Sequence, residues 1–217
     1  MAKILHDHRV FWRQFLEQYH TTGAILPSSR FLARALARYV GGQPGQRILE
    51  VGPGTGAVTG QIVRRMRADA ALDLVELNDE FVRRLHERFA AEEPFCSLGN
   101  RARVLHARVE ELPRDAQYDL IVSGLPLNNF AVADVEQILE AFRRLLLPGG
   151  VLSFFEYVAI RPARALLSGP KQRARLRGIA VALEGLLGPH EIKRDCVWPN
   201  LPPAWVHHVR LSQAGKN

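Results

Sequence analysis

The sequence has little cysteine, no long apolar run and fewer acidic than basic residues. Its two cysteines, Cys96 and Cys196, cannot build a disulfide framework or a zinc site by themselves, so both are expected to be reduced and packed. The absence of a stretch of about 18 apolar residues predicts that no helix spans a membrane. Residues 1–8 lack the apolar core of a signal peptide, which predicts a cytoplasmic location.

The overall composition is that of a folded domain. With 47% hydrophobic and 24% charged residues, the sequence is not that of an intrinsically disordered chain. Its 217 residues suffice for one domain with a substantial core.

The positive charge is concentrated in two segments. The sequence has 29 Lys and Arg residues against 22 Asp and Glu, a net charge of +7. Residues 1–38 hold six basic and two acidic residues, residues 161–177 hold six basic residues and no acidic one, and the remainder is mildly acidic. This distribution predicts a polyanionic partner, either nucleic acid or an anionic membrane face. A solvated charged surface is the alternative.

Two helical segments precede a regular alternation of strands and helices. Residues 3–19 have apolar residues at helical spacing, and a second helix is expected from a cap at Ser28 or Ser29 to about residue 40. Its inward-facing residues are expected to be Phe31, Leu32, Ala35, Leu36 and Tyr39. The alternation that follows predicts a mostly parallel sheet covered on both faces and ending in an antiparallel hairpin. Strands are expected at residues 47–51, 72–76, 103–107, 118–123, 151–157, 191–197 and 206–211, and helices at 58–68, 79–90, 132–147 and 172–187.

A glycine-rich turn follows the first strand and opens a helix. Glycines let the backbone turn sharply and approach a ligand closely, and Gly52-x-Gly54-x-x-Ala57 satisfies a loose dinucleotide fingerprint. Glu50 ends the strand before this turn, where it would repel the pyrophosphate of a dinucleotide. The same carboxylate would attract the cationic methyl donor S-adenosylmethionine (SAM), so the sequence favours a SAM site over an NAD(P) site.

A second acid supports this interpretation. Glu76 ends the second strand, where a carboxylate can accept hydrogen bonds from the ribose hydroxyls of an adenosine. A structural glycine turn beside a solvent-facing Glu76 is the alternative. The expected SAM contacts around the first two strands are Glu50, Gly52, Pro53, Gly54, Thr55, Gly56, Glu76, Leu77 and Asn78.

The adenine is expected near the end of the third strand. Many SAM enzymes place an aspartate there, whereas this sequence has Arg108 followed by Val109, Glu110 and Glu111. We take Glu110 and the backbone of Val109 as the adenine contacts, although the two glutamates equally fit a surface pair.

The fourth strand ends in Ser123-Gly124-Leu125-Pro126. Backbone carbonyls in this turn could accept hydrogen bonds from an amine and aim its lone pair at the donor methyl, which suits N-methylation. Ser123 and Leu125 are therefore predicted SAM contacts, and Ser123 and Gly124 are predicted catalytic residues. No aromatic residue comes between Pro126 and Phe130, which argues against a nucleobase as the methyl acceptor.

Five segments together resemble the bacterial phosphatidylethanolamine/phospholipid N-methyltransferases over nearly the whole chain. They are GAILPSSR at 23–30, EVGPGTG at 50–56, ELN at 76–78, SGLP at 123–126 and WPNLPPA at 198–204. The resemblance implies an α/β, Rossmann-like class I methyltransferase fold: a seven-stranded, mostly parallel sheet with an antiparallel C-terminal strand and an N-terminal helical segment. It also implies SAM as the donor, S-adenosylhomocysteine as the product, and methylation of phosphatidylethanolamine towards phosphatidylcholine.

Alternatives to this function remain open. The rRNA adenine dimethyltransferases are RNA-directed relatives of similar sequence, so an RNA adenine or small-amine N-methyltransferase is one alternative. A non-catalytic module that binds SAM or lipid is another.

The resemblance further implies a division of the chain and a location. Residues 1–40 would form N-terminal amphipathic helices, and residues 41–217 the methyltransferase domain. The helix at 3–19 would dock on an anionic membrane surface, with phospholipid as substrate and no nucleic acid as partner. Packing of that helix on the domain core is the alternative. The enzyme would then be peripheral, on the inner face of the cytoplasmic membrane.

Methylation requires a neutral amine. A free amine with a pKa near that of lysine, about 10.4, costs roughly 4–5 kcal/mol to deprotonate at pH 7. Tyr19 and Tyr157 are the catalytic candidates for orienting the amine, and His20 and Glu156 are further candidates for a base. Core or rim packing is the alternative for both tyrosines. The residues expected to bind the lipid phosphate are Arg161, Arg164, Lys171, Arg173 and Arg175.

Overall fold

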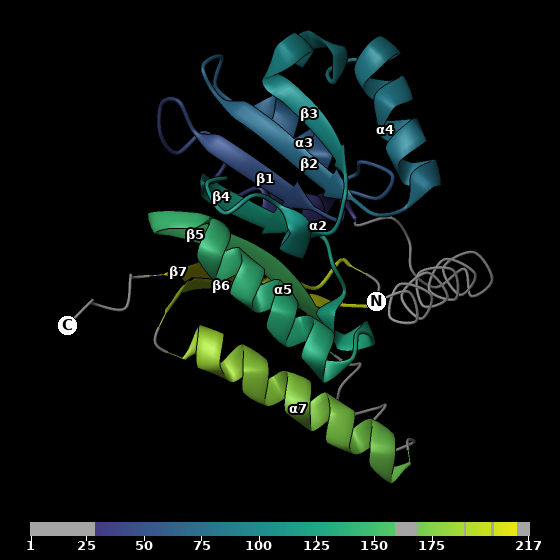
Figure 1. Cartoon of the computed structure of the whole chain (residues 1–217), viewed down its shortest axis with the longest axis vertical. Helices are drawn as coiled ribbons and strands as arrows, with labels where there is room; N and C mark the ends of the chain where they lie inside the picture. The colour runs from purple at the N-terminus through teal and green to yellow at the C-terminus, as the bar shows by residue number, and fades with distance from the viewer. Residues whose placement is uncertain (1–28, 159–168, 189, 201, 212–217) are drawn as a thin grey trace.

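The computed structural model describes residues 29–158, 169–188, 190–200 and 202–211, and these form a seven-stranded sheet with helices on both faces (Figure 1). The strand order is β3-β2-β1-β4-β5-β7-β6. β7 runs antiparallel to its neighbours β5 and β6, and the other pairs are parallel, as the sequence predicts. The strands are β1 Arg47–Val51, β2 Ala71–Glu76, β3 Ala102–His106, β4 Tyr118–Ser123, β5 Leu146–Tyr157, β6 Glu191–Val197 and β7 Ala204–Arg210.

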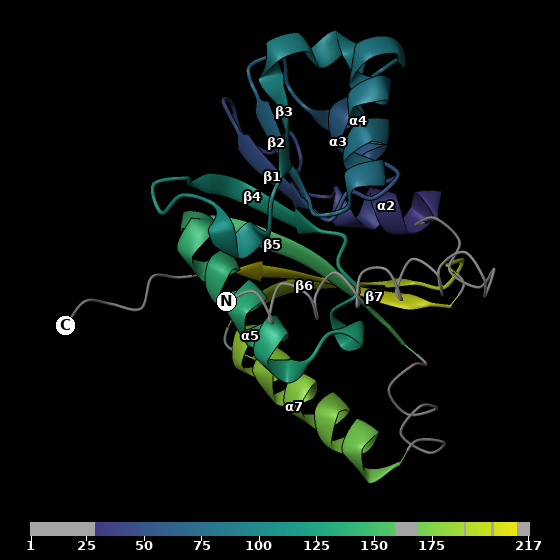
Figure 2. The same cartoon turned by 45° about the vertical axis from the view of Figure 1, so that its right-hand side comes forward.

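Two hydrophobic clusters fill the spaces between the sheet and its two helical layers. One cluster lies under α5 and α7, which pack side by side in both views (Figures 1 and 2). The other joins the opposite face of the sheet to α2, α3 and α4. The helices are α2 Arg30–Leu36, α3 Thr59–Arg65, α4 Asp79–Ala91, α5 Val132–Leu145 and α7 Pro170–Leu187, and the short 3₁₀ helices are η1 Cys96–Arg101, η2 Val109–Glu111 and η3 Leu127–Asn129.

The helix α2 is shorter than predicted and is rotated relative to the predicted apolar face. The Ser29 hydroxyl accepts a hydrogen bond from the Leu32 amide at 3.2 Å and caps the helix, which ends at Leu36. Leu32 and Leu36 are fully buried, and burial of a leucine side chain contributes about 1.5–3 kcal/mol. Phe31, predicted to face inward, is 41% exposed, because the apolar stripe continues through Ala33 instead.

The fifth strand begins earlier than predicted. Pairing with β4 starts at Leu146 and resumes at Val151, so residues 147–150 lie in an irregular stretch of the strand pair. Gly149 takes a positive φ of 77° in this stretch, a conformation that glycine adopts without strain. The Pro-Gly-Gly sequence at 148–150 therefore ends the preceding helix, as expected, but lies within β5 rather than before it.

The segment expected to form the helix at 3–19 lies outside the described residues, and the boundary at residue 40 stays a prediction. In the part of the chain that the structure covers, α2 packs against β5, β6 and β7 and belongs to the same hydrophobic cluster as the sheet. Cys96 and Cys196 are both free and partly buried. None of the helices described is both long and apolar enough to cross a membrane.

Candidate functional site

The carboxyl ends of β1, β2 and β4 meet at one edge of the sheet. Val51 pairs with Val75 of β2 and with Ser123 of β4, so the three loops that follow these strands start level with one another. They enclose a cleft with an empty volume of about 500 Å³. The cleft is lined by six of the predicted SAM contacts, namely Gly52, Glu76, Leu77, Val109, Glu110 and Leu125.

Glu76 holds the loops of this cleft together. Its side chain is almost fully buried, and one carboxylate oxygen accepts the Gly54 amide of the glycine turn at 3.0 Å. The other oxygen accepts the amides of Leu77 and Asn78 at 2.8 and 2.9 Å. Burial raises the pKa of Glu76, and these backbone amides oppose that increase. The carboxylate is thus fixed in place at the edge of the cleft, with lone pairs remaining for ribose hydroxyls.

Glu50 is a buried acid without a matching partner. It is 0% exposed, and within the described residues neither carboxylate oxygen has a hydrogen-bond partner. Burial raises its pKa to about 8, repulsion from Glu76 adds to this increase, and the neighbouring Thr59 offsets only part of it. A buried acid that lacks a partner costs stability, so its presence beside a ligand cleft indicates a cationic ligand.

The glycine turn approaches the β4 loop too closely for larger side chains. A Cβ on Gly52, which has a φ of 69°, would lie 2.5 Å from the Leu125 side chain. A Cβ on Gly124 would lie 2.6 Å from the carbonyl oxygen of Gly52. Gly54 and Gly56 also take positive φ values, so the turn depends on glycine at three positions.

Replacing Gly124 by alanine is therefore expected to push the two loops apart. We expect a loss of about 1–3 kcal/mol in the free energy of unfolding, measured by urea denaturation, together with weaker SAM binding. The matched control is Gly185→Ala in α7, where an added Cβ meets nothing within 4 Å. That control should stabilise the helix by up to about 1 kcal/mol. Equal stabilities for wild type and Gly124→Ala would show that the close approach is not needed.

The adenine side of the cleft contains an ion pair. Arg108 donates to Glu110 at 2.7 Å, and both side chains are largely buried. Glu110 is therefore at the cleft as predicted, but it shares its carboxylate with Arg108. Phe130 and Asp134 also line the cleft and were not predicted as contacts. In the sequence, these two residues are marked only by their position just after the β4 loop. In the structure, the chain turns at η3 and brings both residues to the cleft.

Ser123 and Gly124 shape the β4 loop rather than face the cleft. Ser123 is 0% exposed, and its hydroxyl accepts the Leu125 amide at 3.3 Å. The Gly124 amide donates to the Val51 carbonyl at 2.8 Å, which ties the β4 loop to the end of β1. These contacts fit a positioning role, in which the two residues fix the Leu125 end of the cleft.

The predicted substrate-side residues are only partly described. Tyr157 lies at the end of β5, outside the cleft lining, with its ring edge-on to Phe155 at 5.1 Å. Arg175 donates to the Phe130 carbonyl at 2.6 Å and so ties α7 to the wall of the cleft. Arg173 is exposed on the same helix. Their roles toward substrate stay predictions. The other members of the set, Tyr19, Arg161, Arg164 and the side chain of Lys171, lie outside the described part.

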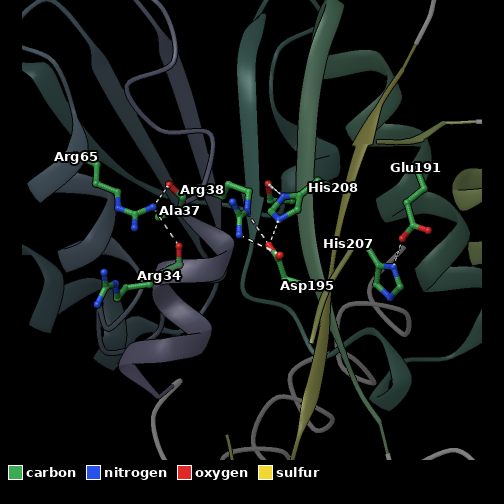
Figure 3. A network of polar contacts seen from close by, with 9 residues as sticks. Arg34, Ala37, Arg38, Arg65, Glu191, Asp195, His207 and His208 are labelled. Atoms are coloured by element: carbon green, nitrogen blue, oxygen red, sulfur yellow. Dashed lines mark hydrogen bonds and ion pairs between the residues drawn. The ribbon is translucent and has the colours of Figure 1, made fainter. Parts of the chain in front are cut away.

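A second polar network crosses β5, β7 and β6 (Figure 3). The Ser153 hydroxyl lies 2.8 Å from Nδ1 of His208, and Nε2 of His208 lies 3.3 Å from Asp195. Arg38 donates to both Asp195 oxygens at 2.7 and 3.0 Å. The order serine, histidine, aspartate resembles a hydrolytic triad, but Ser153 and His208 are 0% exposed, so no substrate reaches them. Burial lowers the pKa of His208 to about 4, which keeps the ring neutral at pH 7.

Beside it, His207 links the two strands that flank β7. Its Nδ1 lies 2.6 Å from Glu191 of β6, and its Nε2 lies 3.6 Å from Glu156 of β5. The ring stacks on Phe154 at 5.2 Å between centroids. Glu156, a predicted candidate for a base, therefore shares its surroundings with a histidine that the sequence pattern did not single out.

The residues of the cleft fit SAM. The donor carries an ammonium and a sulfonium group, and the buried acid Glu50 has no partner among the described residues. The glycine turn leaves room that a Cβ would fill, and Glu76 is held at the strand end where ribose hydroxyls are expected. When bound, the cofactor would be held by these residues together with Val109 and Glu110.

Comparisons with known proteins point to a methyltransferase. Residues 48–150 match the family model described as "Methyltransferase domain". The ornithine lipid N-methyltransferase of Singulisphaera acidiphila is 27% identical over 147 residues, which is 68% of this chain and 76% of that protein. Other curated relatives are longer, and the chain spans 4% of one and 47% of another.

Solved structures confirm the fold. The N-methyltransferase NodS from Bradyrhizobium japonicum WM9, in complex with S-adenosyl-L-homocysteine, superposes with a TM-score of 0.63 at 16% identity, covering 85% of this chain and 87% of that one. The O-methyltransferase TomG from Streptomyces achromogenes, in complex with SAM, gives 0.64 at 15% identity, with coverages of 90% and 86%. Residues 48–150 are therefore similar in sequence to a methyltransferase domain, the chain has the fold of solved class I methyltransferases, and S-adenosylmethionine is the cofactor that its cleft fits.

Proposed function

We propose that this enzyme methylates the headgroup amine of phosphatidylethanolamine, towards phosphatidylcholine, at the surface of an anionic membrane. The proposal rests on one observation, namely that the β4 loop has no exposed aromatic residue. Its first aromatic residue, Phe130, is 7% exposed and lines the cofactor cleft, so the loop offers no exposed ring on which a target base could stack. Similarity to an ornithine lipid N-methyltransferase supports an amine on a lipid as the acceptor.

In this reaction, different residues would bind the cofactor and orient the acceptor amine. Glu76 would accept hydrogen bonds from the ribose hydroxyls, and the negative charge of Glu50 would balance the positive charge of the methyl donor. Carbonyls of the loop at 124–126 accept hydrogen bonds from the acceptor amine and orient its lone pair. When bound, the cofactor would supply an electrophilic methyl group for transfer to the amine nitrogen.

The amine must lose its proton before it can attack. Desolvation beside the buried cleft lowers the pKa of an ammonium group, and a nearby carboxylate can take the proton. Glu156 near the end of β5, which does not itself line the cleft, is the acid that we propose for this task. It is 12% exposed in its side chain and is backed by His207, which in turn contacts Glu191.

The proposal is tested by methyl transfer into lipid. The full chain is incubated with labelled SAM and vesicles of phosphatidylethanolamine and phosphatidylglycerol, and the lipids are separated by thin-layer chromatography. We expect label in methylated phosphatidylethanolamine. Ornithine lipid vesicles, ethanolamine and an adenine-containing RNA are offered in parallel. No labelled phospholipid from a protein that binds SAM would overturn the proposal, and label in one of the parallel substrates would replace it.

A further inference from the structure

A second concave surface lies away from the cofactor cleft, between α2, the end of α3 and β6. It is an open groove with an empty volume of about 960 Å³. Three arginines line it: Arg34 from α2, Arg38 in the turn that follows α2, and Arg65 from α3 (Figure 3). Among the described residues that line it, Asp195 of β6 is the only acid. We refer to it as the α2–β6 groove.

The charges in this groove are not balanced. Asp195 is fully engaged, because Arg38 donates to both of its oxygens and His208 lies 3.3 Å away. Within the described residues the Arg34 guanidinium forms no hydrogen bond or ion pair, and Arg38 follows four residues later, just beyond the end of α2. Like charges at this spacing repel each other, so an anion between them would be stabilising.

Arg65 brings a third positive charge to the same place. Its Nη1 donates to the carbonyls of Arg34 at 3.1 Å and Ala37 at 2.8 Å, which holds the guanidinium at the end of α2. Burial lowers the pKa of Arg65, and the neighbouring charges of Arg34 and Arg38 lower it further. A planar guanidinium beside a second one is the arrangement that binds phosphate oxygens in proteins.

Two exposed aromatic side chains lie at the other end of the groove. Phe31 lines it and is 41% exposed, and Trp198 is 69% exposed between two residues that also line it. The Asn200 side chain accepts the Ser29 amide at 3.3 Å, which keeps the start of α2 against the loop that carries Trp198. Aromatic rings beside basic residues are typical of surfaces that lie in a membrane interface.

The aromatic end of the groove faces the same edge of the sheet as the cofactor cleft. Tyr157 at the end of β5 pairs with Ala204, and Val197 at the end of β6 pairs with the same residue. The loop with Trp198 therefore projects from the carboxyl edge, where the loops after β1, β2 and β4 enclose the cleft. A surface bound there would lie near the opening of the catalytic site.

We infer that the α2–β6 groove binds the phosphate of an anionic phospholipid and docks the enzyme on the bilayer through Phe31 and Trp198. The inference rests on the proposed function in one respect, namely that the bilayer holds the methyl acceptor. Stacked bases of an RNA are the other polyanion that arginines and aromatic rings could bind. The lipid is favoured because the β4 loop at the catalytic site has no exposed ring for a base.

The test measures docking without methyl transfer. The full chain, free of SAM, is mixed with vesicles of phosphatidylglycerol and phosphatidylethanolamine, and bound protein is quantified by flotation. Arg34→Glu reverses one charge in the groove and should lower the partition coefficient about 30-fold, since each basic residue near an anionic leaflet favours binding by about 1 kcal/mol. Trp198→Ala should also weaken docking. Both variants should bind SAM with unchanged affinity in calorimetry.

The matched control makes the same charge change elsewhere. Arg84 is exposed on α4 and does not line the groove, so Arg84→Glu should change the partition coefficient by less than about threefold. Equal losses for Arg34→Glu and Arg84→Glu would overturn the groove as the docking site. Tighter binding of single-stranded RNA than of vesicles, with the same dependence on Arg34, would assign the groove to RNA. Competition by inorganic phosphate without vesicle binding would assign it to a free anion.

Docking and methyl transfer can fail separately. Vesicle binding that depends on Arg34, without labelled lipid, would support the groove and contradict the proposed reaction. Labelled lipid from an Arg34→Glu protein that docks normally would support the reaction and contradict the groove.

Discussion

Replacing Glu76 by glutamine is expected to weaken SAM binding at least 100-fold. The carboxylate accepts three backbone amides, and the ribose hydroxyls would use its remaining lone pairs. A glutamine side chain turns one acceptor oxygen into a donor, which must face either the Gly54 amide or the amides of Leu77 and Asn78. An unpaired buried donor costs about 1–3 kcal/mol, and each lost hydrogen bond to a charged group costs about 1.5–3 kcal/mol.

The measurement is isothermal calorimetry with SAM and with S-adenosylhomocysteine. Because Glu76 also holds the loops together, urea denaturation is run in parallel, and we expect some loss of stability. The matched control is Glu80→Gln, since Glu80 is exposed in the first turn of α4 and lies outside the cleft. The control should lose at most about 1 kcal/mol of stability and keep its SAM affinity. A folded Glu76→Gln protein that binds SAM within threefold of wild type would refute the assigned site.

The sheet and the position of the candidate cleft were predictable because their sequence signals are local. Residues 47–51 and 118–123 are short apolar runs bounded by breaking residues, and both strands have the predicted limits. The glycines after Val51 and the acid at Glu76 lie at strand ends, and parallel neighbours bring such ends to one edge. The topology alone thus places Gly52, Glu76 and Leu125 around one cleft.

Features that depend on contacts between residues far apart in the sequence were not predictable. Arg34 and Arg65 are separated by 30 intervening residues, and their approach depends on how α2 and α3 pack on the same sheet face. The exposure of Phe31 follows from a small rotation of a short helix, since Leu32 and Ala33 are also apolar and serve as its buried face. The partners of His208, Ser153 and Asp195, are set by the register of β5, β7 and β6.

Burial of Glu50 is expected to lower the free energy of unfolding near neutral pH and to favour the binding of cationic SAM. Its pKa is about 8 in the folded protein, against an ordinary value of 4.5 in the unfolded chain. As the pH rises, Glu50 therefore loses its proton first in the unfolded state. The contribution of this residue to the free energy of unfolding is fully present below pH 4.5 and is lost between pH 4.5 and about pH 8. At pH 7 the loss is on the order of 3 kcal/mol.

Glu50→Gln should therefore stabilise the cofactor-free protein while weakening SAM binding. Glutamine has the shape of the protonated acid and no pKa, so the gain in the free energy of unfolding should be near zero at pH 4.5 and reach about 3 kcal/mol at pH 7. Urea denaturation at these two pH values measures it. The exposed Glu80→Gln serves as the control and should show no such change with pH.

The same acid should couple SAM binding to proton release. A cationic ligand favours the charged carboxylate, so wild-type affinity should rise between pH 6 and 8, by at most about tenfold per pH unit. Calorimetry in two buffers of different ionisation enthalpy counts the released proton. In Glu50→Gln the affinity should be lower and nearly flat over this range. A variant as tight as wild type at pH 8, with the same proton release, would mean that the donor's positive charge is balanced by a group other than Glu50.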